Sequence, residues 1–177
     1  MRCANCGAEN SPEELYCSVC GHPLLTDQLS EAERLLVAKN TAYYGRAFSA
    51  LRAGRVAVFN WAACLALPFW AAYRRMALLS LVAILALQVL FWFRVLWLLP
   101  LLMAAGGLFG NWIYYRRVRL IAEELEQQSP GEQELTCRRR GGVSAGGAVL
   151  SAAVLLGMAA GMRFFIHGAA HLFYPRG

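Results

Sequence analysis

The chain has 177 residues, of which 58% are hydrophobic and only 16% are charged. A soluble domain of this size rarely has so apolar a composition, so we expect a mostly α-helical, polytopic membrane protein. Lys and Arg give a net charge of +6, but they cluster at the ends of apolar runs. This placement is typical of membrane topology signals and not of a nucleic-acid-binding surface.

The N-terminus, MRCANCGAEN, has no apolar stretch behind a basic start, so it does not resemble a signal peptide. We therefore expect the N-terminus to stay in the cytoplasm. Thiols are kept reduced there and serve as metal ligands more often than as disulfides.

Four cysteines near the N-terminus form two C-x2-C pairs, and a glycine follows each pair. Two residues between thiolates suit a tight knuckle, and the glycine allows a turn with positive φ. Two such knuckles make a closed tetrahedral site of four thiolates, the geometry of structural zinc, with iron as the alternative metal. We predict a zinc ribbon over residues 1–25 with structural Zn2+ bound by Cys3, Cys6, Cys17 and Cys20.

A ribbon of this size cannot bury a core, so metal binding must supply its folding energy. Its ionisable side chains are Arg2 against Glu9, Glu13 and Glu14, which makes it acidic. Binding to phosphates needs a basic surface, so we do not expect the ribbon to bind nucleic acid. We expect it to contact a protein partner or to have a purely structural role.

Residues 27–54 are predicted to form a juxtamembrane helix and connector. The capping box Ser30-Glu31-Ala32-Glu33 favours a helix from about Glu31 to Ala53. Two interpretations stay open for this helix: it lies on the membrane surface, or it is a solvated connector. Its expected apolar side comprises Leu35, Leu36, Tyr43, Ala47 and Leu51.

Four apolar runs of about 18 to 21 residues follow, and such lengths are just enough to cross a hydrocarbon core of about 30 Å. A polar segment, residues 122–141, separates the third run from the fourth and is predicted to be cytoplasmic. A short amphipathic helix from Arg119 to Gln128 is expected to be broken by Ser129-Pro130-Gly131. The runs are Val56–Tyr73, Met76–Phe93, Val95–Tyr115 and Val143–Met162.

The first run decides the topology. If it spans the membrane, eight arginines between Arg74 and Arg140 lie outside, against the positive-inside rule. If it enters and returns, with Pro68 breaking the helix at the apex, most arginines face the cytoplasm. We therefore predict a re-entrant or interfacial helical hairpin at 56–73 and three spans, at 76–93, 95–115 and within 142–177. Four spans are the alternative.

The same region resembles a known family. Asn60-Trp61-Ala62-Ala63, followed by Trp70 and Tyr73-Arg74-Arg75-Met76, resembles the signature of the bacterial membrane proteins grouped as domain of unknown function 2628. Gly107 to Val118 resembles the second block of that family. The likeness covers roughly residues 40–121, which include the predicted membrane region 55–121 and the residues just before it. Cys64 departs from the signature, which usually has an aromatic residue there. The resemblance implies a multi-pass protein of the bacterial inner membrane, often preceded by a zinc ribbon, and it implies no activity.

The predicted spans contain no Asp, Glu or His, which disfavours ion-coupled transport. Asn60 and Asn111 are expected to cap helices or to hydrogen-bond between them. Three Gly-x3-Gly pairs would let helices approach closely, either between the third and fourth runs or in a homo-oligomer formed by the fourth run. These pairs are Gly106 with Gly110, Gly142 with Gly146, and Gly157 with Gly161.

No catalytic constellation is readable in the sequence: there is no Ser-His-Asp arrangement, no paired carboxylates, no P-loop and no open metal site. We therefore expect no enzyme and no catalytic residue. The first hypothesis is a membrane protein whose cytoplasmic zinc ribbon docks on a protein partner or regulates the protein. The alternative is a small transporter or lipid-handling protein in which the ribbon is a regulatory cap.

Overall fold

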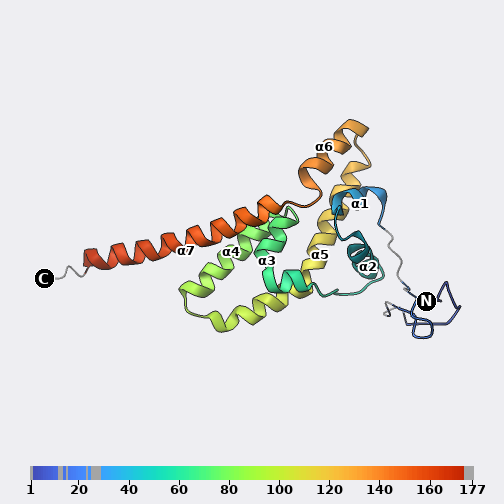
Figure 1. The fold of residues 1–177 in the computed structure, drawn as a ribbon, viewed down its shortest axis with the longest axis horizontal. Helices are drawn as coiled ribbons and strands as arrows, with labels where there is room; N and C mark the ends of the chain where they lie inside the picture. The colour runs from blue at the N-terminus through green and yellow to red at the C-terminus, as the bar shows by residue number, and fades with distance from the viewer. Residues whose placement is uncertain (1, 12–13, 15, 23, 25–28, 174–177) are drawn as a thin grey trace.

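The computed structural model describes residues 2–11, 14, 16–22, 24 and 29–173. After the N-terminal ribbon, the described chain is helical, as the composition predicts (Figure 1). The elements are α1 (Glu31–Val37), α2 (Thr41–Arg52), α3 (Trp61–Tyr73), α4 (Ala77–Trp92), the 3-10 helix η1 (Leu96–Leu98), α5 (Leu99–Leu125), α6 (Pro130–Arg140) and α7 (Ala145–Phe173).

Helix α3 is the centre of the bundle, because it packs against α4, α5 and α7. Helices α1 and α2 pack against α5, and α7 extends beyond the other helices toward the C-terminus (Figure 1). A buried aromatic cluster joins α2, α3 and α5. Its members are Tyr44, Phe48, Trp70 and Tyr114.

The start of α1 confirms the predicted capping box. The Ser30 hydroxyl accepts a hydrogen bond from the Glu33 N–H at 3.2 Å, and the Glu33 carboxylate accepts one from the Ser30 N–H at 2.9 Å. The same carboxylate, which is buried, also pairs with Arg52 at the end of α2. The Glu33 side chain therefore fixes both the start of α1 and the position of α2.

The single helix predicted over residues 31–53 is wrong, because the structure contains two helices separated by a turn at residues 38–40. Two residues of this turn have φ values of 56° and 60°, which end α1. The turn exposes helix-end carbonyls that need donors. Arg74 supplies them, since its guanidinium donates to the carbonyls of Val37 at 3.0 Å and Lys39 at 3.1 Å.

The apolar side of α2 packs within the protein, and the position of this helix at the membrane surface stays a prediction. Phe48, which the predicted apolar side omitted, is fully buried, and Tyr44 is almost so. The Tyr44 ring lies edge-on to Tyr114 of α5, with centroids 5.0 Å apart. Of the residues assigned to the apolar side, Leu35 is 59% exposed and Tyr43 is 36% exposed.

Residues 56–73 do not form the predicted helical hairpin with its apex at Pro68. Residues 56–60 are not helical, and α3 is a bent helix whose kink lies at Ala66, with φ −145° and ψ 45° (Figure 1). The break lets Pro68 sit in the first turn of the second piece, where its missing N–H leaves no intrahelical hydrogen bond unmade. The kink therefore redirects the helix and does not reverse it.

Helix α5 is longer than the third apolar run. The short amphipathic helix predicted at Arg119–Gln128 is not a separate element, because α5 continues without interruption to Leu125. This continuation buries Val118, Ile121 and Leu125 against α1 and α2. The expected break at 129–131 is present, but Ser129 caps a further helix there, α6, with Glu132 completing the capping box.

The glycine pairs are used differently from the prediction. Gly106 and Gly110 allow close approach to α3, since a Cβ at either position would lie 2.7 Å from an atom of Ala63. On α7 the close contact to α3 is made by Gly147, where a Cβ would lie 2.8 Å from the Ala72 carbonyl oxygen. Helices α5 and α7 thus both approach α3. A Cβ added at Gly157 or Gly161 would have no described atom within 4 Å. Dimerisation through these two glycines stays a prediction.

A buried polar network confirms the role expected of Asn60 and Asn111. Asn60 caps α3 by accepting from the Ala63 N–H at 3.0 Å, and its amide donates to the Asn111 side chain at 2.8 Å. The Asn111 amide in turn donates to the Tyr43 hydroxyl at 2.8 Å and to the Val58 carbonyl at 3.1 Å. The two amides therefore hold the start of α3 against the middle of α5.

By length and composition, two helical stretches qualify as membrane spans, Leu96–Leu125 and Pro130–Phe165. Helices α3 and α4 are apolar but shorter, with 13 and 16 residues. These findings agree with a membrane protein, and the number of spans stays a prediction.

Candidate metal centre

The first knuckle of the ribbon is built around Cys3. Its N–H donates to the Ala8 carbonyl at 2.9 Å, and its carbonyl accepts from the Gly7 N–H at 2.9 Å. Gly7 has φ 74°, the left-handed conformation that the glycine after the C-x2-C pair was expected to adopt. These bonds turn the chain so that Cys3 and Cys6 lie on the same side.

The second knuckle repeats the first. The Cys17 N–H donates to the His22 carbonyl at 2.8 Å, and the Cys17 carbonyl accepts from the Gly21 N–H at 2.9 Å. Gly21 has φ 68°. His22 thus takes part through its backbone, at the position that Ala8 occupies in the first knuckle.

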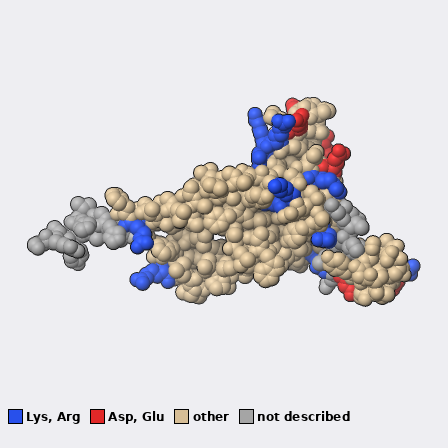
Figure 2. Space-filling view, in the orientation of Figure 1, with Lys and Arg blue, Asp and Glu red and all other residues tan. Residues whose placement is uncertain are grey.

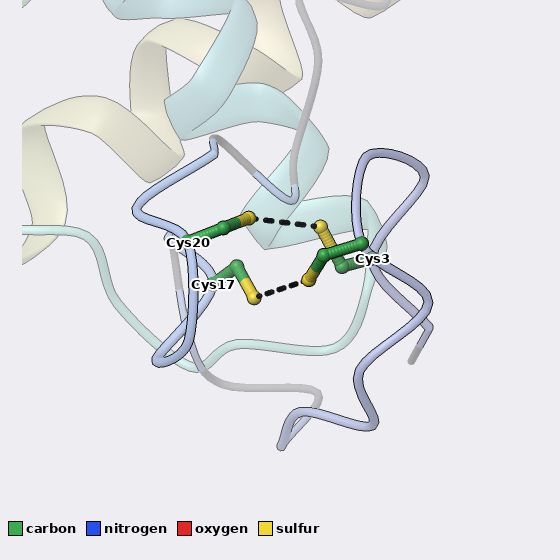
Figure 3. Close-up of side chains that lie close together, drawn as sticks. Cys3, Cys17 and Cys20 are labelled. Atoms are coloured by element: carbon green, nitrogen blue, oxygen red, sulfur yellow. Dashed lines mark hydrogen bonds between the residues drawn. The ribbon is translucent and has the colours of Figure 1, made fainter.

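The two knuckles bring the four predicted ligands together. All four Sγ atoms lie within 4.8 Å of one another. The Cys3 and Cys20 sulfurs are 3.6 Å apart, and a second pair of sulfurs, from Cys6 and Cys17, is 3.5 Å apart (Figure 3). A tetrahedral zinc site with Zn–S bonds of about 2.3 Å has sulfur–sulfur edges of about 3.8 Å. The cysteine donor set and its spacing therefore fit one Zn2+ ion.

Amide side chains surround the sulfurs. Asn10 is buried, and its amide lies 3.5 Å from the Cys17 sulfur and donates to the Ala8 carbonyl at 2.8 Å. The Asn10 oxygen accepts from the Ser18 N–H at 2.9 Å, which ties the first knuckle to the second. Asn5 donates to the Cys20 sulfur at 3.6 Å. Such donors orient thiolate ligands. Neither asparagine could be predicted, because the cysteine spacing does not show which loop amides face the sulfurs.

Without metal, the thiols are unequal acids. Burial raises the pKa of Cys17, but the N–H groups of Cys20 and Val19 outweigh it, so this pKa is lowered to about 6. The Ala8 N–H lowers the pKa of Cys6, but hydrogen bonds shared with the Cys20 and Cys17 sulfurs outweigh it, and this pKa is raised to about 12. A cation that binds all four thiolates must therefore displace protons held within the cluster.

One of three comparisons with known proteins identifies the ribbon. The family model described as zinc-ribbon domain matches residues 2–24. No curated protein and no solved structure matches the chain. The matched segment contains all four clustered cysteines and ends just before the helical bundle. Residues 2–24 are therefore a zinc-ribbon domain, and its four cysteines form a structural zinc site.

Proposed function

We propose that this chain is a non-catalytic membrane protein whose zinc ribbon is a cytoplasmic docking module for a protein partner. The observation that carries the proposal is a pair of apolar side chains beside the ligands: Tyr16 is 51% exposed and Val19 is 73% exposed. A closed four-thiolate site offers no open position for a substrate, so the metal serves to hold these side chains in place. An exposed tyrosine on a rigid scaffold is a typical anchor of protein interfaces, and Val19 adds apolar surface to it.

The charge of the ribbon supports a protein partner over nucleic acid. Residues 2–24 contain a single basic side chain of the Arg or Lys type, Arg2, and three glutamates. Arg2 is paired with Glu9 at 3.3 Å, and both side chains are about 80% exposed. Phosphate binding needs several uncompensated cations on one face, and this segment does not provide them.

The surface of the helical bundle supports a membrane location. Figure 2 shows a broad band without charged side chains, with charge gathered beyond both of its ends. Large apolar side chains are exposed along this band on α4, α5 and α7; examples are Leu78, Leu101 and Leu156, all more than 60% exposed. Water would make such a surface costly, whereas lipid would cover it.

The contacts of α3 support the re-entrant topology. At its start, the Asn60 N–H donates to the carbonyl of Gly107 in the middle of α5, at 2.8 Å. At its end, the Tyr73 carbonyl accepts from the Ser144 N–H at 2.8 Å, just before α7. The non-helical segment 56–60 would then enter to the depth of Gly107, and α3 would return to the cytoplasmic side. The 13 residues of α3 extend only about 20 Å, the shortest of the apolar helices, whereas the 16 residues of α4 extend about 24 Å.

This arrangement leaves α4, α5 and α7 as the spans and the N-terminus in the cytoplasm. Arg94, between α4 and η1, then lies on the non-cytoplasmic side of the membrane with few other basic residues. The arginines near α6 lie on the cytoplasmic side, as the positive-inside rule expects. The resemblance of residues 40–121 to domain of unknown function 2628, and the bacterial inner membrane that it implies, stay predictions that agree with this topology.

The experiment that tests docking is a pull-down of tagged full-length protein from its native membranes in mild detergent. Three variants are compared with the wild type at matched abundance: Cys17→Ser/Cys20→Ser, Tyr16→Ser/Val19→Ser, and Arg2→Gln as the control. We expect a defined partner with the wild type and with the control, and its loss with the other two. A partner that survives Tyr16→Ser/Val19→Ser, or the absence of any partner of the wild type, contradicts the docking role.

Lipid handling is the second candidate function. It is favoured by a cavity of about 700 Å3 among α2, α3 and the start of α7. In that case the ribbon would regulate access to the helical bundle or its assembly.

A further inference from the structure

The cavity among α2, α3 and α7 has one continuous apolar wall. Four large side chains of α3 line it, and they follow one another at intervals of four residues: Trp61, Leu65, Phe69 and Tyr73. Residues four apart lie on one side of a helix, and these four remain on the wall of the cavity despite the kink at Ala66. Trp61 and Leu65 are about 70% exposed, so this end of the cavity is open at the side of the bundle.

The other end of the cavity carries a buried cation, Arg74, whose guanidinium lies against the rings of Tyr44, Tyr73 and Tyr114. Arg74 lines the cavity although only 2% of its surface is exposed. Its terminal nitrogens bind the carbonyls of Val37 and Lys39, but its Nε has no hydrogen-bond partner among the described residues. No carboxylate is found among the described residues that line the cavity. Lys39 is exposed beside Asn40, another lining residue, and adds a second positive charge at this end.

The position of the two ends matches a lipid in one leaflet. The charged end adjoins Arg75, which binds the carbonyls of Arg138 and Arg139 on the side assigned to the cytoplasm. The apolar end adjoins Asn60, which bonds to the middle of α5. Twelve residue steps from Trp61 to Tyr73 extend at most about 18 Å, close to half of a hydrocarbon core of about 30 Å.

We propose that this cavity binds one phospholipid with a net negative headgroup. The headgroup phosphate would lie at Arg74 and Lys39, and one acyl chain would lie along Trp61, Leu65 and Phe69. Two cations without a carboxylate favour an anionic lipid over a zwitterionic one, because the exposed Lys39 ammonium can donate charge-assisted hydrogen bonds to phosphate and the buried Arg74 adds positive charge. The volume of about 700 Å3 lies within the range of small-molecule sites, so it suits the headgroup region and part of one acyl chain. This inference rests on the proposed membrane location of the helical bundle.

The test is native mass spectrometry of the purified full-length protein in detergent. Phosphatidylglycerol and phosphatidylcholine with identical acyl chains are titrated separately, and the first bound lipid is quantified. Leu65→Trp fills the open end of the cavity, and Lys39→Gln removes a cation; both positions are exposed, so both variants should fold. Arg74 is left unchanged because it holds the turn between α1 and α2. The controls are Leu81→Trp on the exposed face of α4 and Arg94→Gln.

We expect the wild type to bind the first phosphatidylglycerol about tenfold more tightly than phosphatidylcholine. Leu65→Trp and Lys39→Gln should each lose most of this preference, and the controls should keep it. Equal binding of the two lipids, or an unchanged preference in Leu65→Trp, overturns the inference. Alkaline extraction of native membranes distinguishes failure of the lipid site from failure of the proposed membrane location. Protein that stays in the membrane but shows no lipid preference contradicts only the lipid site. Protein that is washed off contradicts the proposed location as well as the lipid site.

Discussion

The guanidinium of Arg74 lies over the ring of Tyr44, 4.3 Å from its centroid, and 5.3 Å from the ring centroid of Tyr114. The same group bonds to two carbonyls at the turn that ends α1. Its neighbour Arg75 donates to the Arg138 and Arg139 carbonyls, at 2.8 and 2.9 Å, where α6 ends. Two consecutive arginines after α3 thus satisfy the C-terminal carbonyls of two other helices, where a positive charge is also favoured by the helix dipole.

Replacing Arg74 by Gln should destabilise the bundle by about 3 kcal/mol, because a buried cation with two hydrogen bonds and three aromatic contacts is lost. Lys at this position should recover only part of the loss, since an ammonium cannot present two parallel N–H donors. Thermal unfolding followed by circular dichroism in detergent measures the effect. Arg94→Gln is the matched control, because Arg94 is exposed in the connection after α4. Equal melting temperatures for Arg74→Gln and the control would refute this role.

The bond between Asn60 and Asn111 can be tested by a double-mutant cycle. Asn111→Leu should cost about 2 kcal/mol, since it leaves the Asn60 amide and the Val58 carbonyl without a partner inside the bundle. Asn60→Leu should cost a similar amount and should also lose the cap of α3. Unfolding free energies of both single variants and the double variant give the coupling, which we expect to be about 1 kcal/mol. A coupling of zero would show that the two amides stabilise the fold independently.

The glycines of α5 and α7 offer a matched comparison. Gly106→Ala places a Cβ 2.7 Å from the Ala63 carbonyl oxygen, so we expect a loss of about 1–3 kcal/mol from overpacking. Gly157→Ala meets no described atom within 4 Å, and we expect a gain of about 0.5–1 kcal/mol from the higher helix propensity of alanine. Both variants are measured by thermal unfolding at two protein concentrations. A loss of stability at Gly157 that depends on concentration would instead indicate the homo-oligomer interface predicted for the fourth run.

The features that the sequence predicted well are those set by neighbouring residues. Two C-x2-C-G segments determine the ribbon, and Ser30 with Glu33 determines where α1 begins, because the interacting groups lie within a few positions of one another. The turn at residues 38–40 has no comparable local signal. It depends on Arg74, which is 35 residues from the Lys39 carbonyl that it binds.

The length of α5 was missed for a related reason. Residues 116–125 look like a separate amphipathic helix when they are read alone, since Arg and Glu follow the apolar run. In the structure, Val118, Ile121 and Leu125 pack against α1 and α2, and this packing keeps one helix continuous through the change of composition. Contacts between distant segments therefore decided where this helix ends.

The metal of the ribbon is expected to be zinc at about one ion per chain. Elemental analysis of the purified protein distinguishes it from iron, which would also give a visible thiolate absorption band. Cys17→Ser/Cys20→Ser should lose the metal and keep the helical circular dichroism, since the matched segment ends before α1. Cys64→Ser/Cys137→Ser is the control that should keep the metal, because these two cysteines lie outside the cluster. Stoichiometric iron in the wild type would contradict the assignment.

The topology can be tested with reporter fusions on either side of α4. A periplasmic reporter fused after Met76 should be inactive, because the proposed re-entrant path of 56–73 would return the chain to the cytoplasm beside the Arg138 carbonyl that Arg75 binds. The same reporter fused after Arg94 should be active, since α4 lies between the two positions. Both fusions contain residues 1–76, so differences in the ribbon or in the start of the chain cannot explain a difference in reporter activity. Activity after Met76 would mean that α3 completes a crossing, which would place Arg75 and α6 outside and reverse the assignment of every later helix.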